Sequence, residues 1–288
     1  MAAEAEPPFA NIAIAGYGLV GASLGMAIRQ RWPKAIVIAI DRKDVIETAM
    51  RLHAADVGGD DVGLAAGAEL IVLAAPVLAN IDLLSRLADV VPGSAMVTDV
   101  GGTKRQTVAA ARHLPDRLAF VGGHPLAGAA AGGIDAARPD LFAGRPWILT
   151  PDESDPPPAL IDFLTQLGAR IQLMTPATHD DLLAYISHLP QLTASALMAI
   201  VGAGAGRPGL DLAGRGLRDT TRLASSPPGI WRDIAATNRD HIGKALDELI
   251  ALLARLRADL ERDGGEIDPL FRSAAGWKQI LEDAFEKP

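Results

Sequence analysis

The stretch that decides the fold is IAIAGYGLVGASLGMAIRQRWPKAIVIAID, which runs from Ile12 to Asp41. Its first apolar run predicts a buried strand, the amphipathic segment after it predicts a helix, and a second apolar run ends in Asp41. Between strand and helix stands the loop GYGLVG, with an acid about 20 residues beyond its last glycine. This context favours a dinucleotide-binding βαβ unit over a glycine turn in some other α/β protein.

Each part of the loop has a physical task. Gly16 permits the tight turn, Gly18 leaves room for a pyrophosphate, and Gly21 lets the helix pack closely on the strand. Asp41 can accept both hydroxyls of an adenosine ribose and would repel a 2′-phosphate, which favours NAD; Arg42 beside it keeps NADP as the less favoured cofactor. The candidate cofactor-binding residues are Gly16, Tyr17, Gly18, Leu19, Val20, Gly21, Asp41, Arg42, Ala75, Pro76 and Asp99.

Composition narrows the possible partners. The chain has 288 residues, is 49% hydrophobic and carries a net charge of −8 without a basic run, which argues against nucleic acid and anionic membrane as partners. It has no cysteine, so disulfides and thiolate chemistry are excluded. The acidic N-terminus lacks the regions of a signal peptide, which favours a cytoplasmic location.

Strand and helix patterns alternate along the first part of the chain. Further strands are expected at 70–74, 95–98, 118–121, 147–150 and 170–174, and further helices at 81–90, 103–112 and 159–167. This alternation predicts an α/β fold, a Rossmann-type doubly wound parallel sheet with helices on both faces and ligands at the carboxyl ends of its strands. We place this dinucleotide-binding domain at 9–175.

Strand signals stop at Thr175-Pro176, and long helical patterns follow. Helices are expected at 182–201, 230–261 and 273–285, with a flexible connector at 202–209. The segment 182–201 is apolar but interrupted by polar residues, so we interpret it as a buried core helix and not as a membrane span. We therefore expect an all-α substrate-binding and dimerisation domain at 176–288, in a protein that forms a homodimer.

Two histidines are candidates for chemistry. His124 follows a strand end between glycines, where a neutral imidazole could take a proton from a hydroxyl while the carbon gives a hydride to nicotinamide; it could also cap a turn. His188 precedes Pro190, whose kink would free a carbonyl at a site wall, although a core histidine bonded to backbone is equally compatible.

Arginines on one helical segment are the third candidate feature. Arg215, Arg218 and Arg222 are suited to carboxylate recognition; alternatively, Arg218 and Arg222 pair locally with Asp219 on a solvated helix turn. No spacing of histidines and carboxylates suggests a metal site. The other histidines have no supporting pattern and are expected to be surface or structural residues: His53, His113, His179 and His241.

Taken together and in order, the motifs of this chain resemble those of the prephenate and arogenate dehydrogenases of tyrosine biosynthesis. The resemblance covers about 11–238 and rests on GYGLVG (16–21), DVGGTK (99–104), GGHPLAG (122–128), ISHLP (186–190), RDTTR (218–222) and WRDI (231–234). It implies an NAD-dependent oxidoreductase that oxidises the ring C4 hydroxyl of prephenate and releases the ring carboxylate as CO2, giving 4-hydroxyphenylpyruvate. It also implies a nucleotide-binding domain followed by a helical dimerisation domain.

The resemblance assigns roles residue by residue. His124 matches the family's catalytic histidine, and His188 lines the same pocket. Arg222 matches the arginine that binds a substrate carboxylate, and Asp219 and Trp231 match residues around the pocket.

Three positions depart from the family pattern. Gly102 stands where a serine often touches the C4 oxygen, so Thr103 or water would have to replace that hydroxyl. Ala130 and Gln191 stand where members that prefer prephenate often carry a glutamate and a histidine, which keeps arogenate open as the substrate. The residues are also compatible with a dehydrogenase of an amino-deoxy prephenate analogue and with a non-catalytic nucleotide-sensing protein.

Overall fold

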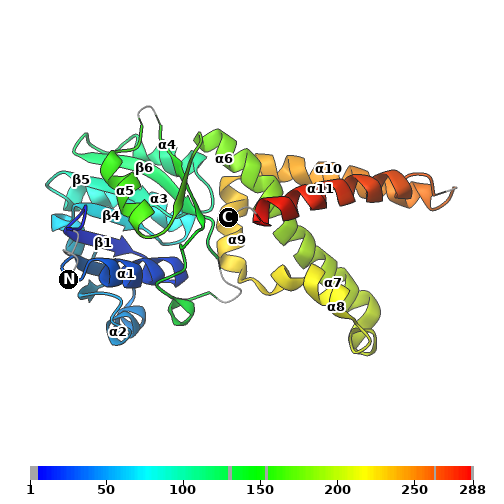
Figure 1. The fold of residues 1–288 in the computed structure, drawn as a ribbon, viewed down its shortest axis with the longest axis horizontal. Helices are drawn as coiled ribbons and strands as arrows, with labels where there is room; N and C mark the ends of the chain where they lie inside the picture. The colour runs from blue at the N-terminus through cyan, green and yellow to red at the C-terminus, as the bar shows by residue number, and fades with distance from the viewer. Residues whose placement is uncertain (1–5, 129–131, 153–154, 263, 287–288) are drawn as a thin grey trace. The chain divides into compact units, whose positions relative to one another are not determined.

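The computed structural model describes residues 6–128, 132–152, 155–262 and 264–286, and the chain forms two compact units, 1–239 and 240–288 (Figure 1). The first unit is built on one eight-stranded sheet with the order β3-β2-β1-β4-β5-β6-β7-β8. The strands are β1 (Asn11–Ala15), β2 (Ile36–Ile40), β3 (Val57–Gly59), β4 (Leu70–Leu73), β5 (Ala95–Asp99), β6 (Leu118–Pro125), β7 (Pro146–Thr150) and β8 (Arg170–Leu173).

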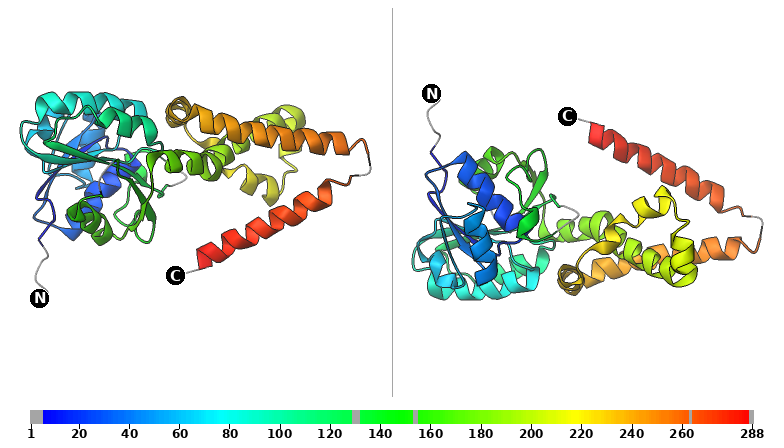
Figure 2. Two further views of the ribbon diagram at one scale, coloured as in Figure 1. Left: turned by 90° about the horizontal axis from the view of Figure 1, so that it is seen from above. Right: turned by 90° about the horizontal axis from the view of Figure 1, so that it is seen from below.

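The sheet is parallel from β3 to β6, as the alternating pattern predicts. Apolar side chains of its strands point alternately to two faces, because successive residues of a strand face opposite ways. Ile12 and Ile14 belong to one core, which α1 (Leu19–Arg31), α2 (Lys43–Arg51) and α5 (Pro158–Gln166) cover. Ala13 and Ala15 belong to the other, which η1 (Val62–Gly67), α3 (Val77–Val90) and α4 (Arg105–Ala111) cover; Figure 2 shows helices on both faces.

Strand β6 is longer than the sequence predicts. The expected strand ends at Val121, but β6 continues through Pro125 because its second half pairs antiparallel with β7, with His124 opposite Ile148. Glycine in a strand interior marks a close approach of other groups. A Cβ on Gly123 would lie 2.5 Å from the carbonyl oxygen of Asp99, so the glycine at this position lets β6 approach β5 closely.

Helices follow β8, as the sequence predicts. They are α6 (Pro176–Leu183), the π-helical turn η3 (Ala184–His188), α7 (Leu189–Leu210), α8 (Arg215–Thr220), the 3₁₀ turn η4 (Arg222–Ser225) and α9 (Pro228–Thr237). A short 3₁₀ turn, η2 (Ile134–Ala136), lies in the earlier β6–β7 connection.

Two expectations for this region are wrong. The segment 202–209 is not a flexible connector but belongs to α7, which is interrupted only at Gly206, where φ is +60°. Nor is α7 a buried core helix: only Gln191 and Ala194 are buried, and Ile200 is 72% exposed. Apolar composition alone does not distinguish a helix covered by its own chain from one that presents an apolar face. By length and composition the continuous run 176–210 would also suffice to cross a membrane.

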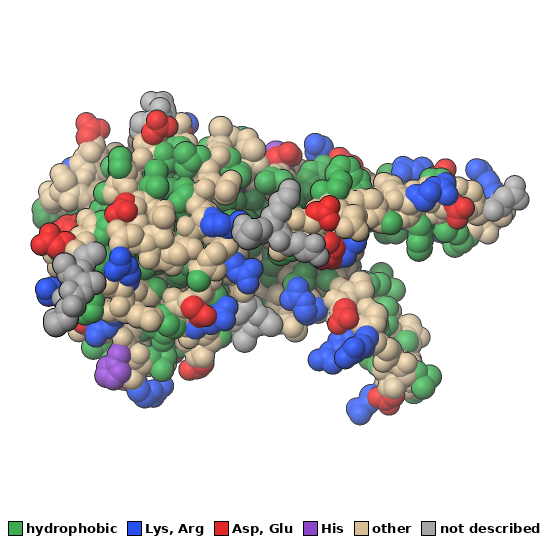
Figure 3. Space-filling view, in the orientation of Figure 1, with side chains coloured by type: hydrophobic (Ala, Val, Ile, Leu, Met, Phe, Trp, Pro, Cys, Tyr) green, Lys and Arg blue, Asp and Glu red, His purple; other side chains and the backbone are tan. Residues whose placement is uncertain are grey.

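The second unit consists of α11 (Ile267–Glu286) and most of α10 (Arg239–Asp259). Its apolar side chains are unusually exposed for their size, with Phe271 and Trp277 both 70% exposed. In Figure 3, charged side chains gather along one side of these helices and hydrophobic side chains along the other. Exposed apolar area of this kind marks an interaction surface.

Candidate active site

The three glycine-containing loops expected at the strand ends lie at one edge of the sheet. The loop 16–21 follows β1, the segment 100–104 follows β5, and His124 lies near the end of β6. Because β1, β4, β5 and the first half of β6 are parallel, their carboxyl ends share that edge. The sheet therefore brings together the dinucleotide loop and the first catalytic candidate.

The loop 16–21 has room only for glycine at two positions. Gly16 has φ of +98°, and a Cβ there would lie 2.3 Å from the backbone nitrogen of Ala75. A Cβ on Gly21 would lie 2.0 Å from the carbonyl oxygen of Gly16. Gly18 instead faces open space and caps the N-terminus of α1 without a side-chain partner. A phosphate can approach the free N–H groups of α1 at this point.

Tyr17 contributes its backbone to this loop. Its N–H donates to Oδ2 of Asp41 over 2.6 Å, whereas its phenol is buried, donates to the carbonyl of Ala54 and has a pKa raised by burial. Oδ1 of Asp41 accepts the backbone N–H of Arg42, so the carboxylate is fixed between the first two strands. The Arg42 guanidinium is exposed and lies 3.5 Å from Asp44.

The remaining cofactor candidates border the loop. Leu19 and Val20 open α1 and are half-buried, and Pro76 caps the N-terminus of α3. The N–H of Ala75 donates to the buried side chain of Asn80. Open space at Gly18, a helix N-terminus and a fixed carboxylate on the neighbouring strand fit a dinucleotide with free ribose hydroxyls.

Asp99 has a different environment from the other cofactor candidates. It is fully buried in an ion pair with Lys104, and its oxygens also accept the N–H groups of Gly101 (2.9 Å) and Gly123 (3.0 Å). Nζ of Lys104 donates in addition to the carbonyl of Gly123 over 2.8 Å, and burial lowers its pKa against the pull of Asp99. This pair joins the ends of β5 and β6 and so fixes the strand segment that carries His124.

His124 is partly exposed and contacts another histidine. Its Nδ1 lies 2.9 Å from Nε2 of His179, and Nδ1 of His179 lies 2.8 Å from Oδ1 of Asp180. Both His179 and Asp180 belong to α6 and are fully buried. Burial, followed by electrostatic repulsion from His179 and Lys104 on protonation, holds the pKa of His124 well below its usual value, so the imidazole is neutral at pH 7.

His188 closes the π-helical turn before Pro190. The N–H of Leu189 reaches back to the carbonyl of Ala184, one residue further than in an α-helix. His188 is bonded to the backbone of Gly102, and Nδ2 of Asn238 lies 3.4 Å from its Nδ1. Burial lowers its pKa to about 4.

Thr103 is occupied by a contact with α9. Its hydroxyl lies 2.7 Å from that of Thr237, both residues are buried, and the Thr237 hydroxyl in turn donates to the carbonyl of Asp233. Gly102 is partly exposed, and a Cβ there would meet Cδ1 of Ile234 at 3.3 Å. The Thr103 hydroxyl is therefore bonded to α9.

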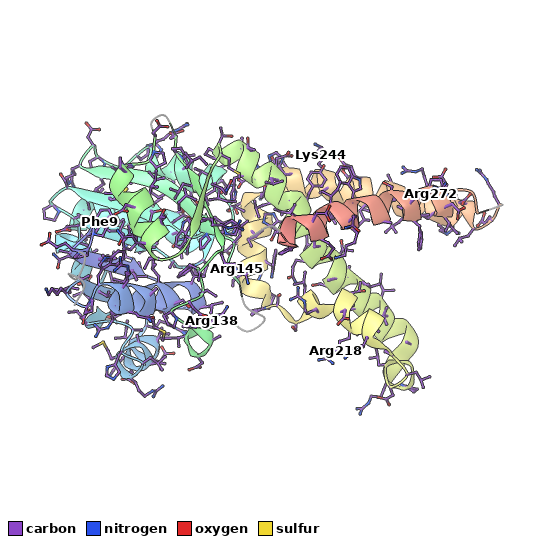
Figure 4. All side chains as sticks on the ribbon, in the orientation of Figure 1. Phe9, Arg138, Arg145, Arg218, Lys244 and Arg272 are labelled. Atoms are coloured by element: carbon purple, nitrogen blue, oxygen red, sulfur yellow. The ribbon has the colours of Figure 1, made fainter. Side chains whose placement is uncertain are left out.

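The arginine-bearing segment lies outside this buried cluster. Arg222 and Asp219 are exposed on η4 and α8, as is Arg218, which Figure 4 labels. Gln191 of α7 fixes η4, since its amide donates to the carbonyl of Leu223 and its oxygen accepts the hydroxyl of Ser226. Trp231 of α9 stands edge-on to His188 with ring centroids 6.2 Å apart. Ala130 lies outside the described residues.

Sequence reasoning overlooked the buried partners of the two candidate histidines. His179 stands in no recognisable pattern, yet the structure places it between His124 and Asp180. Neither Lys104, within the motif 99–104, nor Asn238 was expected to join the site. The adjacent pair His179-Asp180 directly after a helix start was an available signal, because polar residues that become buried need hydrogen-bond partners.

Comparisons with known proteins agree on one family. Residues 24–173 match the family model described as "Prephenate dehydrogenase, nucleotide-binding domain", and 175–273 match "Prephenate dehydrogenase, dimerization domain". Prephenate dehydrogenase of Bacillus subtilis is 34% identical over 94% of this chain and 76% of its own length.

Two solved structures are similar over nearly all of the chain. Synechocystis arogenate dehydrogenase has a TM-score of 0.77 and 32% identity, covering 94% of this chain and 99% of that one. Prephenate dehydrogenase from Aquifex aeolicus in complex with hydroxyphenyl propionate and NAD+ has a TM-score of 0.84 and 26% identity, covering 98% and 99%.

Proposed function

Because this chain belongs to the prephenate dehydrogenase family, we propose that it converts prephenate to 4-hydroxyphenylpyruvate in tyrosine biosynthesis. It is an NAD-dependent oxidoreductase of the prephenate and arogenate class. The observation that carries the more specific proposal is a neutral, partly exposed His124 fixed by buried polar groups at the sheet edge that bears the dinucleotide loop.

His124 is the base of the proposed reaction. Its lowered pKa leaves a lone pair available at neutral pH, so it accepts the proton of the ring C4 hydroxyl. NAD held at the loop 16–21 would supply the acceptor for the hydride of C4. Loss of the hydride makes the ring electron-deficient. The electron pair left behind when the ring carboxylate departs as CO2 enters the ring and makes the product aromatic. The protein needs to supply only a base, the correct orientation and a cation for the carboxylates.

The cofactor and substrate occupy neighbouring parts of this edge. The N–H groups at Gly18 and the start of α1 would hold the pyrophosphate of NAD, and Asp41 would hold its adenosine ribose. Arg222 binds a substrate carboxylate, with Asp219 and Trp231 at the pocket rim. His188, which is 1% exposed, would support the wall of the pocket through its contacts with Gly102 and Trp231. A water beside Gly102 would supply the hydroxyl contact that serine often makes in relatives.

Two functional domains, 9–175 and 176–288, best account for the chain. The change from strands to helices after β8 supports this division. The exposed apolar side chains of α7 and α11, among them Ile200, Phe271 and Trp277, support a homodimer formed through the second domain. The buried polar residues of the run 176–210 favour a soluble, cytoplasmic protein, since His179, Asp180 and His188 form bonds with the sheet domain or with α9.

Arogenate is the second candidate substrate. Prephenate-preferring relatives often carry a histidine where this chain has Gln191. The amide of Gln191 forms hydrogen bonds with η4 and the residue after it. The arogenate dehydrogenase of Synechocystis is also similar over 94% of the chain. Arogenate differs from prephenate only in its side chain, so the roles of His124 and the cofactor loop are the same for both.

The test is NADH formation by the purified protein with prephenate or arogenate, each with NAD and with NADP. We expect turnover of prephenate with NAD and a loss of about 10²- to 10⁴-fold in kcat for His124→Asn, the usual value of a positioned base. The surface variant His113→Asn is the matched control. Turnover of arogenate alone would replace the substrate assignment, and a His124→Asn variant as active as the wild type would remove the base.

A further inference from the structure

A series of three side chains leads from the partly exposed His124 into the interior of the protein. The His124 and His179 rings stand edge-on with centroids 5.1 Å apart and planes at 61°, joined through Nδ1 and Nε2. The second nitrogen of His179 meets Asp180. His179 and Asp180 are fully buried, so neither is a candidate for contact with substrate.

The innermost member fixes the direction of the hydrogen bonds. Asp180 accepts the backbone N–H groups of Lys104 (2.7 Å) and Arg105 (3.0 Å) and also Nε of Arg105 (3.3 Å). Burial on its own raises the pKa of Asp180, but the bonds from His179 and the two backbone N–H groups outweigh it and lower the pKa. Asp180 is thus an ionised carboxylate that only accepts, and Nδ1 of His179 must carry the proton between them.

The same logic passes outward to His124. Burial lowers the pKa of His179 despite the opposing bond to Asp180, so its imidazole is neutral and Nε2 has a lone pair. That lone pair accepts a proton from Nδ1 of His124. Since His124 is neutral as well, its Nε2 is the nitrogen without a hydrogen.

We propose that His179 and Asp180 are positioning residues that fix His124 in the Nδ1–H tautomer, so that its Nε2 is always the proton acceptor. This inference rests on the proposed role of His124 as base. The substrate O–H bond breaks, an N–H bond forms at Nε2, and the hydride and CO2 leave the ring as before. The imidazolium that results keeps Nδ1–H bonded to His179, and the Asp180 carboxylate offsets its charge through that ring.

Neighbouring charges around the pair explain why the carboxylate is needed. Lys104 and His188 face His124, and Lys104 and Asp99 face His179. The positive charge of Lys104 opposes protonation of His124. Asp99 is already paired with Lys104, and Arg105 is paired with Asp180. Asp180 is the carboxylate that is connected to His124 through hydrogen bonds.

The first test measures the tautomer directly. In protein labelled with ¹⁵N in its histidine rings, His124 should show a protonated Nδ1 and an imine-type Nε2 at neutral pH. Its signals are identified among the six histidines by the His124→Asn and His113→Asn variants. Observation of the Nε2–H tautomer in the wild-type protein would overturn the proposal.

The second test removes the hydrogen-bonded relay that His179 forms between His124 and Asp180. His179→Leu abolishes both hydrogen bonds, so we expect His124 to lose its fixed tautomer and kcat to fall at least about 10-fold, with about 10⁴-fold as the upper limit for such an orienting group. His179→Gln, whose amide can accept from His124 and donate to Asp180, should recover part of kcat. The KM for NAD should be unchanged in both variants, and His113→Leu is the control.

The outcomes separate the relay from the base. A folded His179→Leu variant that is less active but keeps the wild-type ¹⁵N pattern would show a structural role only and overturn the relay. If His179→Leu does not fold, the wild-type spectrum and the His179→Gln variant still decide. If His124 is not the base of the proposed reaction, His124→Asn would retain turnover whichever tautomer the spectrum shows. That result is distinct from failure of the relay. Asp180→Asn should also shift the acid limb of kcat/KM to lower pH, since the charge that favours the imidazolium is gone.

Discussion

Polar side chains are buried in one region of the first unit and exposed in another. Around His124 the charged and polar groups are buried and bonded to one another, from the Asp99–Lys104 pair to Asp180 and Asn238. On α8 and η4, Arg218 and Arg222 are exposed. Within the described residues, no hydrogen bond or ion pair involves either guanidinium.

The difference separates two tasks of the proposed reaction. A base must keep its geometry without substrate, because a fixed orientation lowers the barrier only if it has been set in advance. A carboxylate-binding arginine gains its partner when the substrate arrives. The buried cluster should therefore govern stability and kcat, and the arginine segment should govern substrate affinity.

The largest expected effect comes from breaking the buried ion pair. Lys104→Met leaves the Asp99 carboxylate fully buried without its cation, which costs about 3 to 5 kcal/mol of unfolding free energy. Urea unfolding measures this loss. The exposed Arg218→Met should stay within about 0.5 kcal/mol of wild type. Adding Asp99→Asn to Lys104→Met should recover part of the loss, and an equal loss in the double variant would refute the pairing argument.

Acid should destabilise the buried cluster through its histidines. His188 has a pKa of about 4 in the folded protein, against about 6.5 in the unfolded chain. The unfolded state therefore binds a proton that the folded state does not, and stability falls as pH decreases from 6.5 toward 4, by up to about 3 kcal/mol. Unfolding measured between these pH values should be less pH-dependent in His188→Asn, whereas His113→Asn should retain the wild-type slope.

Substrate affinity should depend on the exposed region. In the proposed substrate complex, Arg222→Ala removes a charged hydrogen bond to a substrate carboxylate, which is worth about 1.5 to 3 kcal/mol. The KM for prephenate should rise roughly 10- to 150-fold, while the unfolding free energy and the NAD affinity stay unchanged. The exposed Arg86→Ala on α3 is the control. A loss confined to kcat would place Arg222 with the buried cluster and break the comparison.

The sequence predicted the frame of the molecule well. The loop 16–21 predicted the first βαβ unit, and the alternation of strand and helix patterns after it predicted the doubly wound sheet, because turn, strand and helix signals are local. Strand β6 was predicted too short, since Gly122 and Gly123 disfavour a strand locally and only the antiparallel partner β7 extends it. The exposed α7 was misjudged for a similar reason: its apolar composition does not show what covers it.

The candidate site was predictable in its motifs and not in its network. His124 and His188 stand in recognisable loops, but His179 is 55 residues from its partner and has no motif of its own. Asp99 was expected to contact the cofactor because it ends a strand. Its burial with Lys104 depends on the approach of β6, which sequence spacing does not reveal.

The smallest expected effect comes from substituting Gly102, which lies next to the buried cluster and is partly exposed. Gly102→Ser would restore the hydroxyl that relatives have beside the C4 oxygen, a bond worth about 0.5 to 1.5 kcal/mol, or roughly 2- to 10-fold in kcat/KM. Its Cβ would lie 3.3 Å from Cδ1 of Ile234, so that side chain must shift slightly. Gly102→Ala introduces the same crowding without the hydroxyl and should lower kcat/KM. If serine does no better than alanine, water already makes the contact, and the geometry of the buried cluster is complete without a side chain at this position.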